Sequence, residues 1–215
     1  MASEGGSVKK LVLASKNQGK ITELERILSD YATDIKVLGL KEFPNMPEVI
    51  ESGNSLTENS LLKAKQISEF TGLPALADDS GLFVDALNGD PGVYSARWAQ
   101  YLGDDARTRD RLNMEKVLSQ LLEIPSGKRS AKFKTSVTFY DAKLDGLVVK
   151  KEQKGELEGE ISKQPFGSNG FGYDPIFIPA GFDQTLAQLS SGQKDEISHR
   201  GMALRAITPY LVEYL

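Results

Sequence analysis

Residues 77–82 read Ala-Asp-Asp-Ser-Gly-Leu and place two adjacent carboxylates between an apolar run and a glycine. The run that ends there, residues 73–77, is short and uncharged, which is typical of a buried strand. The Ser-Gly pair that follows indicates a turn. We therefore predict that Asp78 and Asp79 lie where a strand leaves the core, which is where open α/β sheets bind ligands.

These two carboxylates have more than one interpretation. Because side chains alternate along a strand, only one of Asp78 and Asp79 is expected to face a ligand. A carboxylate in that position can hold Mg²⁺ or accept a proton from water. Taken alone, the string Asp-Asp-Ser-Gly is more typical of a solvated turn. The other motifs of the chain change that balance.

The composition is that of an ordinary globular protein. The chain has 215 residues, of which 40% are hydrophobic and 26% are charged. This length allows one large domain or one domain in two lobes. The formal net charge of -4 argues against a sequence-independent binder of duplex nucleic acid, although a small anionic ligand needs only a local cluster of positive charge.

The chain also lacks several familiar signals. It has no cysteine, which excludes disulfides, a thiolate metal site and a cysteine nucleophile. Residues 1–7 are polar, lack the apolar core of a signal peptide and are expected to form a flexible tail. No apolar stretch approaches the length that spans a membrane. We therefore expect a soluble, cytoplasmic protein with no membrane partner.

The N-terminal part of the chain predicts a strand, a polar loop and a helix. Residues 8–14 are largely apolar, residues 15–20 form a polar stretch with one glycine, and apolar residues recur at helical spacing over 21–31. The loop amides and the helix N-terminus can face an anion, and Lys16 or Lys20 can add positive charge. A capped helix start with solvated lysines explains the same residues.

A second helix is predicted over residues 56–70. Ser55 and Glu58 fit a capping box at its start. Lys63 lies on this helix, where a solvated lysine is the simplest interpretation. Glu51 precedes a glycine and is either a metal ligand or a loop residue.

The remaining elements give a mixed pattern, with an antiparallel meander in the second half. The final helix contains Pro209, which predicts a kink or a restart with Thr208 as the cap. Because the sequence shows no linker, we predict one α/β domain over residues 8–215, with two lobes and a cleft between them. Strands are expected at 35–40, 131–140, 147–149, 156–161 and 175–178, and further helices after Asp104 or Asp105 with Leu122 on the buried side, at 183–189 and from 198 onward.

Residues 165–174 form a loop with three glycines and three aromatic residues. A glycine-rich loop that presents Phe171 and Tyr173 is suited to stacking a nucleobase, and a satellite aromatic cluster under a long loop is the alternative. His199 is the only histidine and is flanked by serine and arginine. A single histidine is more often structural than catalytic, and with no cysteine it argues against a structural zinc site.

Taken together, these motifs resemble the inosine/xanthosine triphosphate pyrophosphatases, the non-standard purine NTP pyrophosphatases. Each motif alone is a weak signal, but six in this order over residues 11–204 are specific. The blocks are Ser15-Lys-Asn-Gln-Gly-Lys20, Glu58-Asn59 with Lys63-Ala64, Ala77-Asp-Asp-Ser-Gly-Leu82, Pro91-Gly-Val-Tyr-Ser-Ala-Arg97, Gly170-Phe-Gly-Tyr-Asp-Pro175 and Ser198-His-Arg-Gly201.

The resemblance implies an elongated, two-lobed α/β fold with a mixed sheet and a central substrate cleft, usually in a homodimer. It implies Mg²⁺-dependent hydrolysis of purine nucleoside triphosphates (ITP, dITP, XTP and dXTP) to the monophosphate and pyrophosphate. Such an activity cleanses the nucleotide pool of deaminated purines.

The resemblance also implies roles for individual residues. Asp79 matches the catalytic base, and Glu51 and Asp79 match the metal-site carboxylates. The positions that match substrate-binding residues are Ser15, Lys16, Asn17, Gln18, Gly19, Lys20 and Lys63 for the phosphates, Ser80 as a further contact, and Phe171, Gly172, Tyr173, Asp174, Lys194, Ser198, His199 and Arg200 for the base.

The chain departs from the family pattern at Trp98, Asn169 and Pro209, none of which carries an implied catalytic role. Two alternative functions stay open. One is a pyrophosphatase that acts on pyrimidine or modified triphosphates. The other is a catalytically silent nucleotide-binding regulator, against which the presence of both Glu51 and Asp79 argues.

Overall fold

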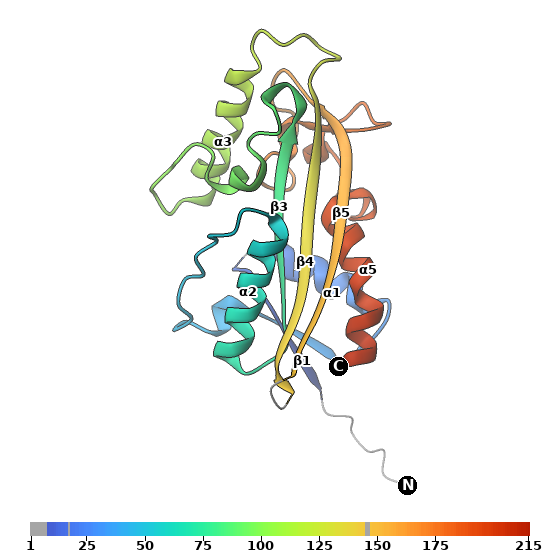
Figure 1. Cartoon of the computed structure of the whole chain (residues 1–215). Helices are drawn as coiled ribbons and strands as arrows, with labels where there is room; N and C mark the ends of the chain where they lie inside the picture. Colours follow the sequence, from blue (N-terminus) through green and yellow to red (C-terminus); the bar gives the residue numbers. More distant parts are fainter. Residues whose placement is uncertain (1–7, 17, 145–146) are drawn as a thin grey trace. The chain divides into compact units, whose positions relative to one another are not determined.

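The computed structural model describes residues 8–16, 18–144 and 147–215 and shows an α/β protein (Figure 1). The expected tail over residues 1–7 lies outside the described residues. The elements are β1 (Lys9–Leu13), α1 (Gln18–Ser29), β2 (Ile35–Gly39), α2 (Leu56–Thr71), β3 (Ala75–Val84), α3 (Ala106–Gln120), β4 (Ser130–Leu144), β5 (Leu147–Ile161), β6 (Phe177–Pro179), α4 (Ser191–Ile197) and α5 (His199–Tyr214). Short 3-10 helices are η1 (Leu40–Glu42), η2 (Asp85–Leu87), η3 (Gly92–Arg97), η4 (Asp174–Ile176) and η5 (Leu186–Gln188).

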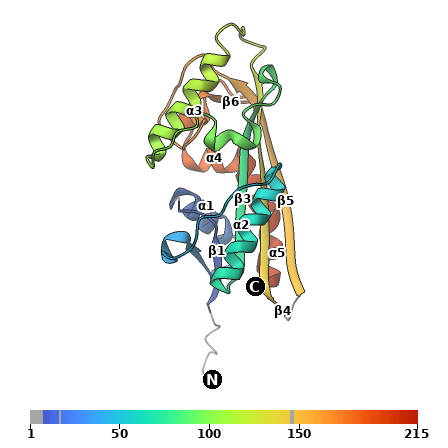
Figure 2. The ribbon, with the colours of Figure 1, turned by 60° about the vertical axis from the view of Figure 1, so that its left-hand side comes forward.

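Within the described residues, six strands form one sheet in the order β2-β1-β3-β4-β5-β6. Strand β1 pairs in parallel with β2 and β3, because α1 and α2 carry the chain back between these strands. The long strands β4 and β5 are neighbours (Figure 2), and β6 pairs antiparallel with β5. The predicted α/β class with a mixed sheet is confirmed.

The chain forms two compact units, each assembled from separate segments. The first unit comprises Met1–Asp79, Ser136–Lys154 and Ala203–Leu215, and the second comprises Ser80–Thr135 and Gly155–Met202. The chain therefore passes from one unit to the other inside β3, β4, β5 and α5, which explains why the sequence shows no linker.

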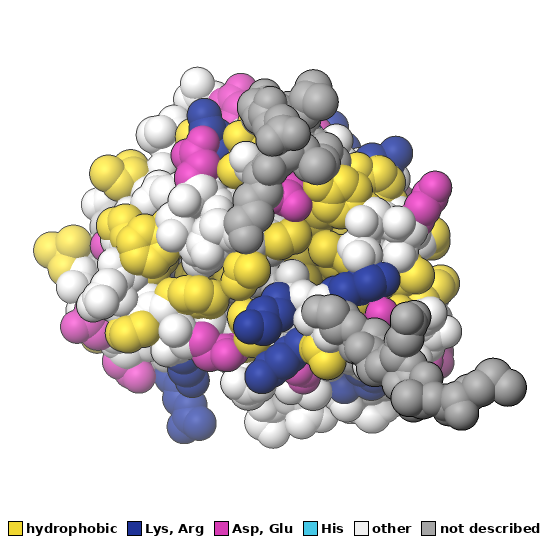
Figure 3. All heavy atoms as spheres, turned by 90° about the horizontal axis from the view of Figure 1, so that it is seen from below, with side chains coloured by type: hydrophobic (Ala, Val, Ile, Leu, Met, Phe, Trp, Pro, Cys, Tyr) yellow, Lys and Arg dark blue, Asp and Glu magenta, His cyan; other side chains and the backbone are white. Residues whose placement is uncertain are grey.

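The surface mixes charge of both signs. On the face shown in Figure 3, basic and acidic side chains are scattered among hydrophobic atoms.

Among the helices that the structure describes, none is long and apolar enough to cross a membrane.

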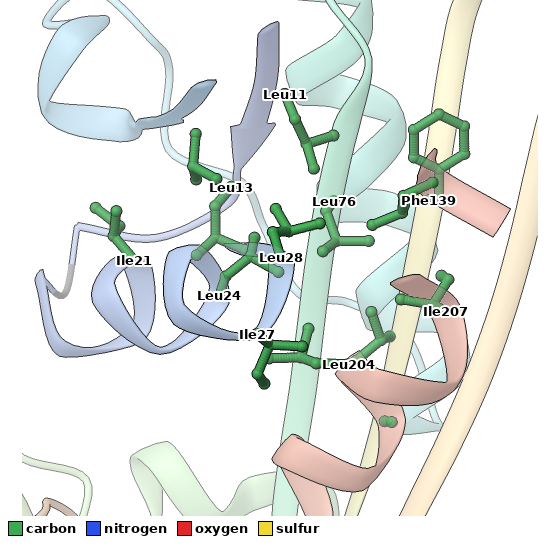
Figure 4. Close-up of a cluster of buried hydrophobic side chains, with 14 residues drawn as sticks. Leu11, Leu13, Ile21, Leu24, Ile27, Leu28, Leu76, Phe139, Leu204 and Ile207 are labelled. Carbon is green, nitrogen blue, oxygen red and sulfur yellow. The ribbon is translucent and has the colours of Figure 1, made fainter. Parts of the chain in front are cut away.

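The first unit carries helices on both faces of its strands. Leu11 of β1 and Leu76 of β3 point toward α1 and α5, as Figure 4 shows. Their neighbours Val12 and Ala75 belong instead to a cluster with Ile67 of α2. Because successive side chains of a strand point to opposite faces, strands that are covered on both faces are apolar throughout.

The ends of α2 are fixed by local interactions. Ser55 Oγ accepts a hydrogen bond from the backbone N–H of Glu58, so the predicted cap is confirmed. The Glu58 carboxylate accepts from the backbone N–H of Asn54, at 2.7 Å, instead of closing a capping box. The helix ends at Gly72, whose φ of 62° lies in the left-handed region that glycine adopts without a steric cost.

The second unit has its own core beneath α3. Asp105 caps this helix by accepting from the backbone N–H of Thr108, at 2.7 Å. Leu121 is fully buried, but Leu122 is 77% exposed, so its assignment to the buried side was wrong. The reason is that α3 ends at Gln120 and the chain then leaves the helical register.

The charged segment of β5 was wrongly predicted as a break. The expected strands 147–149 and 156–161 are parts of the single strand β5, so the meander has one strand fewer. Within that segment, Glu152 Oε1 accepts a hydrogen bond from Ser136 Oγ of β4 at 3.3 Å. Further along β5, Lys132 of β4 lies 3.0 Å from Glu156 and 2.9 Å from Glu158. Charged residues therefore continue the strand instead of ending it. Residues 145–146, between β4 and β5, lie outside the described residues.

Helix α5 runs through Pro209 as one helix, so the predicted restart is wrong, and the alternative of a kink stays a prediction. Thr208 lies inside the helix, and its hydroxyl donates to the backbone carbonyl of Leu204 at 2.8 Å. Ile207 and Leu211 are both fully buried in the core, which holds the helix together although proline lacks an N–H donor.

Two shorter elements also differ from their predicted bounds. The strand expected at 175–178 begins only at Phe177, because η4 precedes it. The helix expected at 183–189 is reduced to the single 3-10 turn η5.

Candidate active site

Asp78 and Asp79 lie in the middle of β3 and not at its end. They are only 3% and 9% exposed, and the strand continues through the Ser-Gly pair to Val84. The predicted turn is therefore wrong. A Cβ atom at Gly81 would collide with the backbone carbonyl of Gly92, so this glycine permits a close approach of two backbone segments within the second unit.

The two carboxylates have different partners, as strand alternation predicted. Asp78 shares a face with Leu76, and its Oδ2 accepts a hydrogen bond from Lys20 Nζ of α1 at 2.6 Å. Asp79 faces α2 instead, where Lys63 and Asn59 contact it. The strand therefore presents one buried carboxylate to each helical layer of the first unit.

Lys63 forms ion pairs with both carboxylates that the family pattern assigns to a metal. Its Nζ lies 2.8 Å from Glu51 Oε1 and 3.2 Å from Asp79 Oδ1. Burial lowers the pKa of Lys63, but Asp79, Glu51 and Asp78 together raise that pKa above its ordinary value. Burial raises the pKa of Asp79, Lys63 lowers it and Glu51 raises it, and the net pKa lies above that of an ordinary aspartate.

Asn59 is a member of this cluster that sequence reasoning did not select. It is fully buried, and its Nδ2 donates to Asp79 Oδ2 at 3.1 Å. The available signal was its place beside Glu58 in one of the family blocks.

The cluster fits a divalent cation that also binds a phosphorylated ligand. In the described part of the chain, no group of three or more His, Cys, Asp or Glu side chains could hold a metal ion. Mg²⁺, however, is usually held by one or two carboxylates, with water and phosphate completing its shell. Glu51 and Asp79 already converge on a cation, the Lys63 ammonium, so their donor chemistry fits such an ion.

The predicted phosphate loop joins β1 to α1. Ser15 is buried at the end of the strand, while Lys16, Gln18 and Gly19 are exposed at the start of the helix. Asn17 lies outside the described residues. The N-terminus of α1 thus faces solvent, as an anion-binding role requires.

In the second unit, Phe171, Asp174 and Lys194 come together. The Phe171 side chain is exposed, and Lys194 Nζ lies 4.5 Å from its ring centroid. Lys194 also forms an ion pair with the buried Asp174, whose Oδ2 accepts from the backbone N–H of Phe171 at 2.8 Å. Burial raises the pKa of Asp174 and Lys194 lowers it, leaving the pKa above its ordinary value.

Tyr173 does not present its ring as predicted. It is buried in the core, and its hydroxyl donates to the backbone carbonyl of Ser95 at 2.8 Å. The backbone N–H of Gly172 donates to Asp110 Oδ2 of α3 at 2.9 Å. Asp110 therefore fixes the loop, and no local sequence signal pointed to it. Phe171 is the ring of this motif that reaches the surface.

Of the remaining predicted residues, Ser198, His199 and Arg200 are buried within the second unit, and Ser80 is half-buried there. Ser198 Oγ accepts from the backbone N–H of Gly201 at 2.9 Å, which caps α5. His199 stacks on Phe133, with ring centroids 4.7 Å apart. Arg200 is also buried. Ser80 donates to the hydroxyl of Thr135 at 2.8 Å; these residues thus have structural partners in addition to any ligand.

The fold and these motifs define an α/β protein with a carboxylate–lysine cluster in its first unit and, in its second, an aromatic loop that Lys194 of α4 contacts. The model of the Ham1 family matches residues 11–210, and the chain belongs to the Ham1 family.

Named relatives and solved structures agree with this assignment. A dITP/XTP pyrophosphatase of Streptomyces coelicolor is 44% identical, over 96% of this chain and 98% of that protein. The structure of a HAM1 protein from Coxiella burnetii matches with a TM-score of 0.80 at 40% identity, covering 95% of this chain and 99% of that one. A nucleoside-triphosphatase, or dITP/XTP pyrophosphatase, from Mycobacterium abscessus matches with a TM-score of 0.69 at 42% identity, covering 93% and 99%.

Proposed function

We propose that this chain hydrolyses non-standard purine nucleoside triphosphates (ITP, dITP, XTP and dXTP) to the monophosphate and pyrophosphate. Membership of the Ham1 family and the names of its similar relatives support the proposal. The structural observation that carries it is the convergence of Glu51 and Asp79 on the ammonium of Lys63.

The reaction is proposed to depend on Mg²⁺, held by Glu51 and Asp79 together with substrate oxygens. When bound, such an ion neutralises phosphate charge and polarises a phosphoryl oxygen. Lys63 lies between the two carboxylates. With the ion bound there, the positive charge of Lys63 would help to neutralise the triphosphate. Lys20 and the loop residues Ser15, Lys16, Asn17, Gln18 and Gly19 are proposed to bind the remaining phosphate oxygens.

Asp79 is proposed to orient the attacking water and accept its proton. The water oxygen forms a bond to the α phosphorus, and the bond from that phosphorus to the bridging oxygen of pyrophosphate breaks. Burial raises the pKa of Asp79, which makes its carboxylate a stronger base than an exposed aspartate. No covalent intermediate is required, which suits a chain without cysteine.

The base is proposed to be recognised by residues of the second unit. Phe171 supplies an exposed ring for stacking, and Gly172, Tyr173 and Asp174 shape the loop that carries it. Lys194 and Arg200, with Ser80, Ser198 and His199, are proposed as the other contacts. Hypoxanthine and xanthine carry a 6-oxo acceptor, whereas adenine carries an amino donor there. A site that offers donors at that position rejects adenine, because a donor would be left facing a donor.

The experiment that tests this proposal is a pyrophosphate-release assay with ITP, dITP and XTP against ATP, GTP and a pyrimidine triphosphate. We expect release of pyrophosphate from the inosine and xanthosine substrates with Mg²⁺, and its loss in excess EDTA. Orthophosphate as the first product, or full activity in EDTA, would contradict the proposal. Preference for pyrimidines would favour the first alternative function, and tight binding without turnover would favour a silent regulator.

The family resemblance further supports a homodimer that acts on free nucleotides in the cytoplasm. The net charge of -4 supports the absence of duplex nucleic acid among its partners. Light scattering coupled to size exclusion tests the dimer, since a monomer at micromolar concentration would contradict it.

A further inference from the structure

Asn59 makes two side-chain hydrogen bonds from a fully buried position on α2. Its Oδ1 accepts from the backbone N–H of Gly53 at 2.8 Å, and its Nδ2 donates to Asp79 Oδ2 at 3.1 Å. Both partners lie in the first unit. The side chain therefore ties the segment that follows Glu51 to a carboxylate in the middle of β3.

The direction of the amide is set by chemistry. The backbone N–H of Gly53 can only donate, so the oxygen of the Asn59 amide must face it. The nitrogen then faces Asp79 and holds one of its two carboxylate oxygens. The other oxygen of Asp79 is the one that faces Lys63, at 3.2 Å.

The backbone around Gly53 is built for this contact. A Cβ atom at that position would lie 2.7 Å from Asn59 Oδ1 and 2.6 Å from Glu58 Cβ. Real Cβ atoms do not approach other atoms so closely. Glycine therefore lets the segment that follows Glu51 pack directly against the side-chain amide of Asn59. Asn59 thus ties the segment that follows Glu51 to Asp79, in addition to the Lys63 ion pairs that join the two carboxylates.

We propose that Asn59 is a positioning residue, which fixes the orientation of the Asp79 carboxylate and the place of the Glu51 segment beside it. The inference rests on the proposed function, since it concerns the same two carboxylates. Outer groups that orient metal-binding carboxylates change metal affinity or activity by about 10- to 100-fold when they are replaced.

Two substitutions separate the two hydrogen bonds. Asn59→Asp keeps an oxygen that can accept from Gly53 but puts a carboxylate in place of the donor that faces Asp79. Asn59→Leu removes both interactions without a large change in volume. The first variant therefore tests the orientation of Asp79 while it preserves the anchor of the Glu51 segment.

Asn113 on α3 provides the matched control. It is also buried, its Oδ1 accepts from the backbone N–H of Ala99 at 2.7 Å, and its Nδ2 donates to the carbonyl of Ala96 at 3.2 Å. It has the same pattern of bonds but contacts no carboxylate through them. Asn113→Asp and Asn113→Leu report what the loss of a buried amide does to stability alone.

The test measures four quantities on the full chain. They are kcat and KM for dITP with saturating Mg²⁺, the dissociation constant of Mn²⁺ alone from the spin-resonance signal of the free ion, and the thermal unfolding midpoint. We expect Asn59→Asp to lower kcat by at least about tenfold, with a smaller change in KM. We expect Asn59→Leu to weaken Mn²⁺ binding by at least about tenfold. Asn113 variants should lower the unfolding midpoint and leave kcat and Mn²⁺ affinity unchanged.

An Asn59→Asp variant with wild-type kcat and Mn²⁺ affinity would overturn the proposal. Equal losses in the Asn113 variants would overturn it too, because destabilisation alone would then explain them. If Asn59→Leu does not fold, the measurements on Asn59→Asp still test the proposed role of Asn59. A wild-type chain that releases no pyrophosphate from dITP would refute the proposed function instead, and the Mn²⁺ measurement would still test the role of Asn59.

Discussion

The ammonium of Lys20 lies 2.6 Å from a carboxylate oxygen of Asp78, which is only 3% exposed in the middle of β3. Sequence reasoning assigned Lys20 to the phosphates and left Asp78 without a role. The structure shows that Lys20 also compensates a buried charge from the first turns of α1. A single lysine thus connects the stability of the first unit to the loop proposed to bind phosphate.

We predict that Lys20 and Asp78 are coupled in stability. Lys20→Met should destabilise the fold by about 2–4 kcal/mol, because it leaves a buried carboxylate without its cation. Asp78→Asn in the same chain should recover part of that loss, giving a coupling energy of about 1–3 kcal/mol. Urea unfolding of the two single variants and the double variant measures this term. Strictly additive effects would show that the pair is not coupled.

A second prediction concerns Arg129, a buried residue of the second unit. Its guanidinium donates to the backbone carbonyls of Leu121, Ile161 and Ser162 at 2.7–2.9 Å. Arg129→Met should cost at least about 2 kcal/mol, because buried carbonyls lose their donors.

Arg111→Met is the control for this loss. Arg111 makes an exposed ion pair with Glu115 at 2.7 Å, and such pairs contribute at most about 1 kcal/mol. Urea unfolding of the two variants compares a buried with an exposed guanidinium. Similar losses in both would contradict the structural role of Arg129.

Base recognition gives a third prediction. Phe171→Ala should weaken the binding of all purine triphosphates alike, by about 1–3 kcal/mol, because stacking does not depend on the groups at the base edge. Lys194→Met should instead narrow the preference of kcat/KM for ITP over ATP. Phe166→Ala is the matched control for Phe171, since both rings are 43% exposed and belong to the same glycine-rich loop.

Values of kcat/KM for ITP, XTP, GTP and ATP across these variants supply the measurement. An unchanged ITP-to-ATP ratio in Lys194→Met would refute its part in recognising the 6-oxo group. Losses of equal size in Phe166→Ala and Phe171→Ala would refute a specific stacking role.

The elements that the sequence predicted well are those with local causes. Helix α2 begins at the Ser55 cap and ends at Gly72, and both residues act through neighbours within one turn. The Ser80-Gly81 pair was wrongly predicted as a turn, because the requirement for glycine at position 81 does not come from neighbouring residues in the sequence. Gly81 is needed where the backbone of Gly92 approaches, and that contact is invisible in a linear pattern.

In the candidate site too, the sequence indicated individual residues but not the contacts that depend on tertiary packing. Asp79 was predicted within a family block and Glu51 through the family resemblance outside those blocks, yet Lys63 joins the two carboxylates only because α2 packs on β3. The simplest interpretation of Lys63 in the sequence was a solvated helix lysine, because helical position alone does not reveal a buried partner. Asp110 had no signal of any kind, since it acts through the backbone N–H of Gly172 on a distant loop.

The central claim is that Asp79 activates water for attack on a triphosphate, and the most direct measurement is kcat for pyrophosphate release from dITP by the wild-type chain and Asp79→Asn. The account predicts a fall of at least about 100-fold, the lower end of general base contributions, with little change in the unfolding midpoint because the two side chains are nearly isosteric. Asp78→Asn, which alters the carboxylate on the opposite face of β3, should reduce kcat much less. A near-normal kcat in Asp79→Asn, or equal losses in the two variants, would contradict the account.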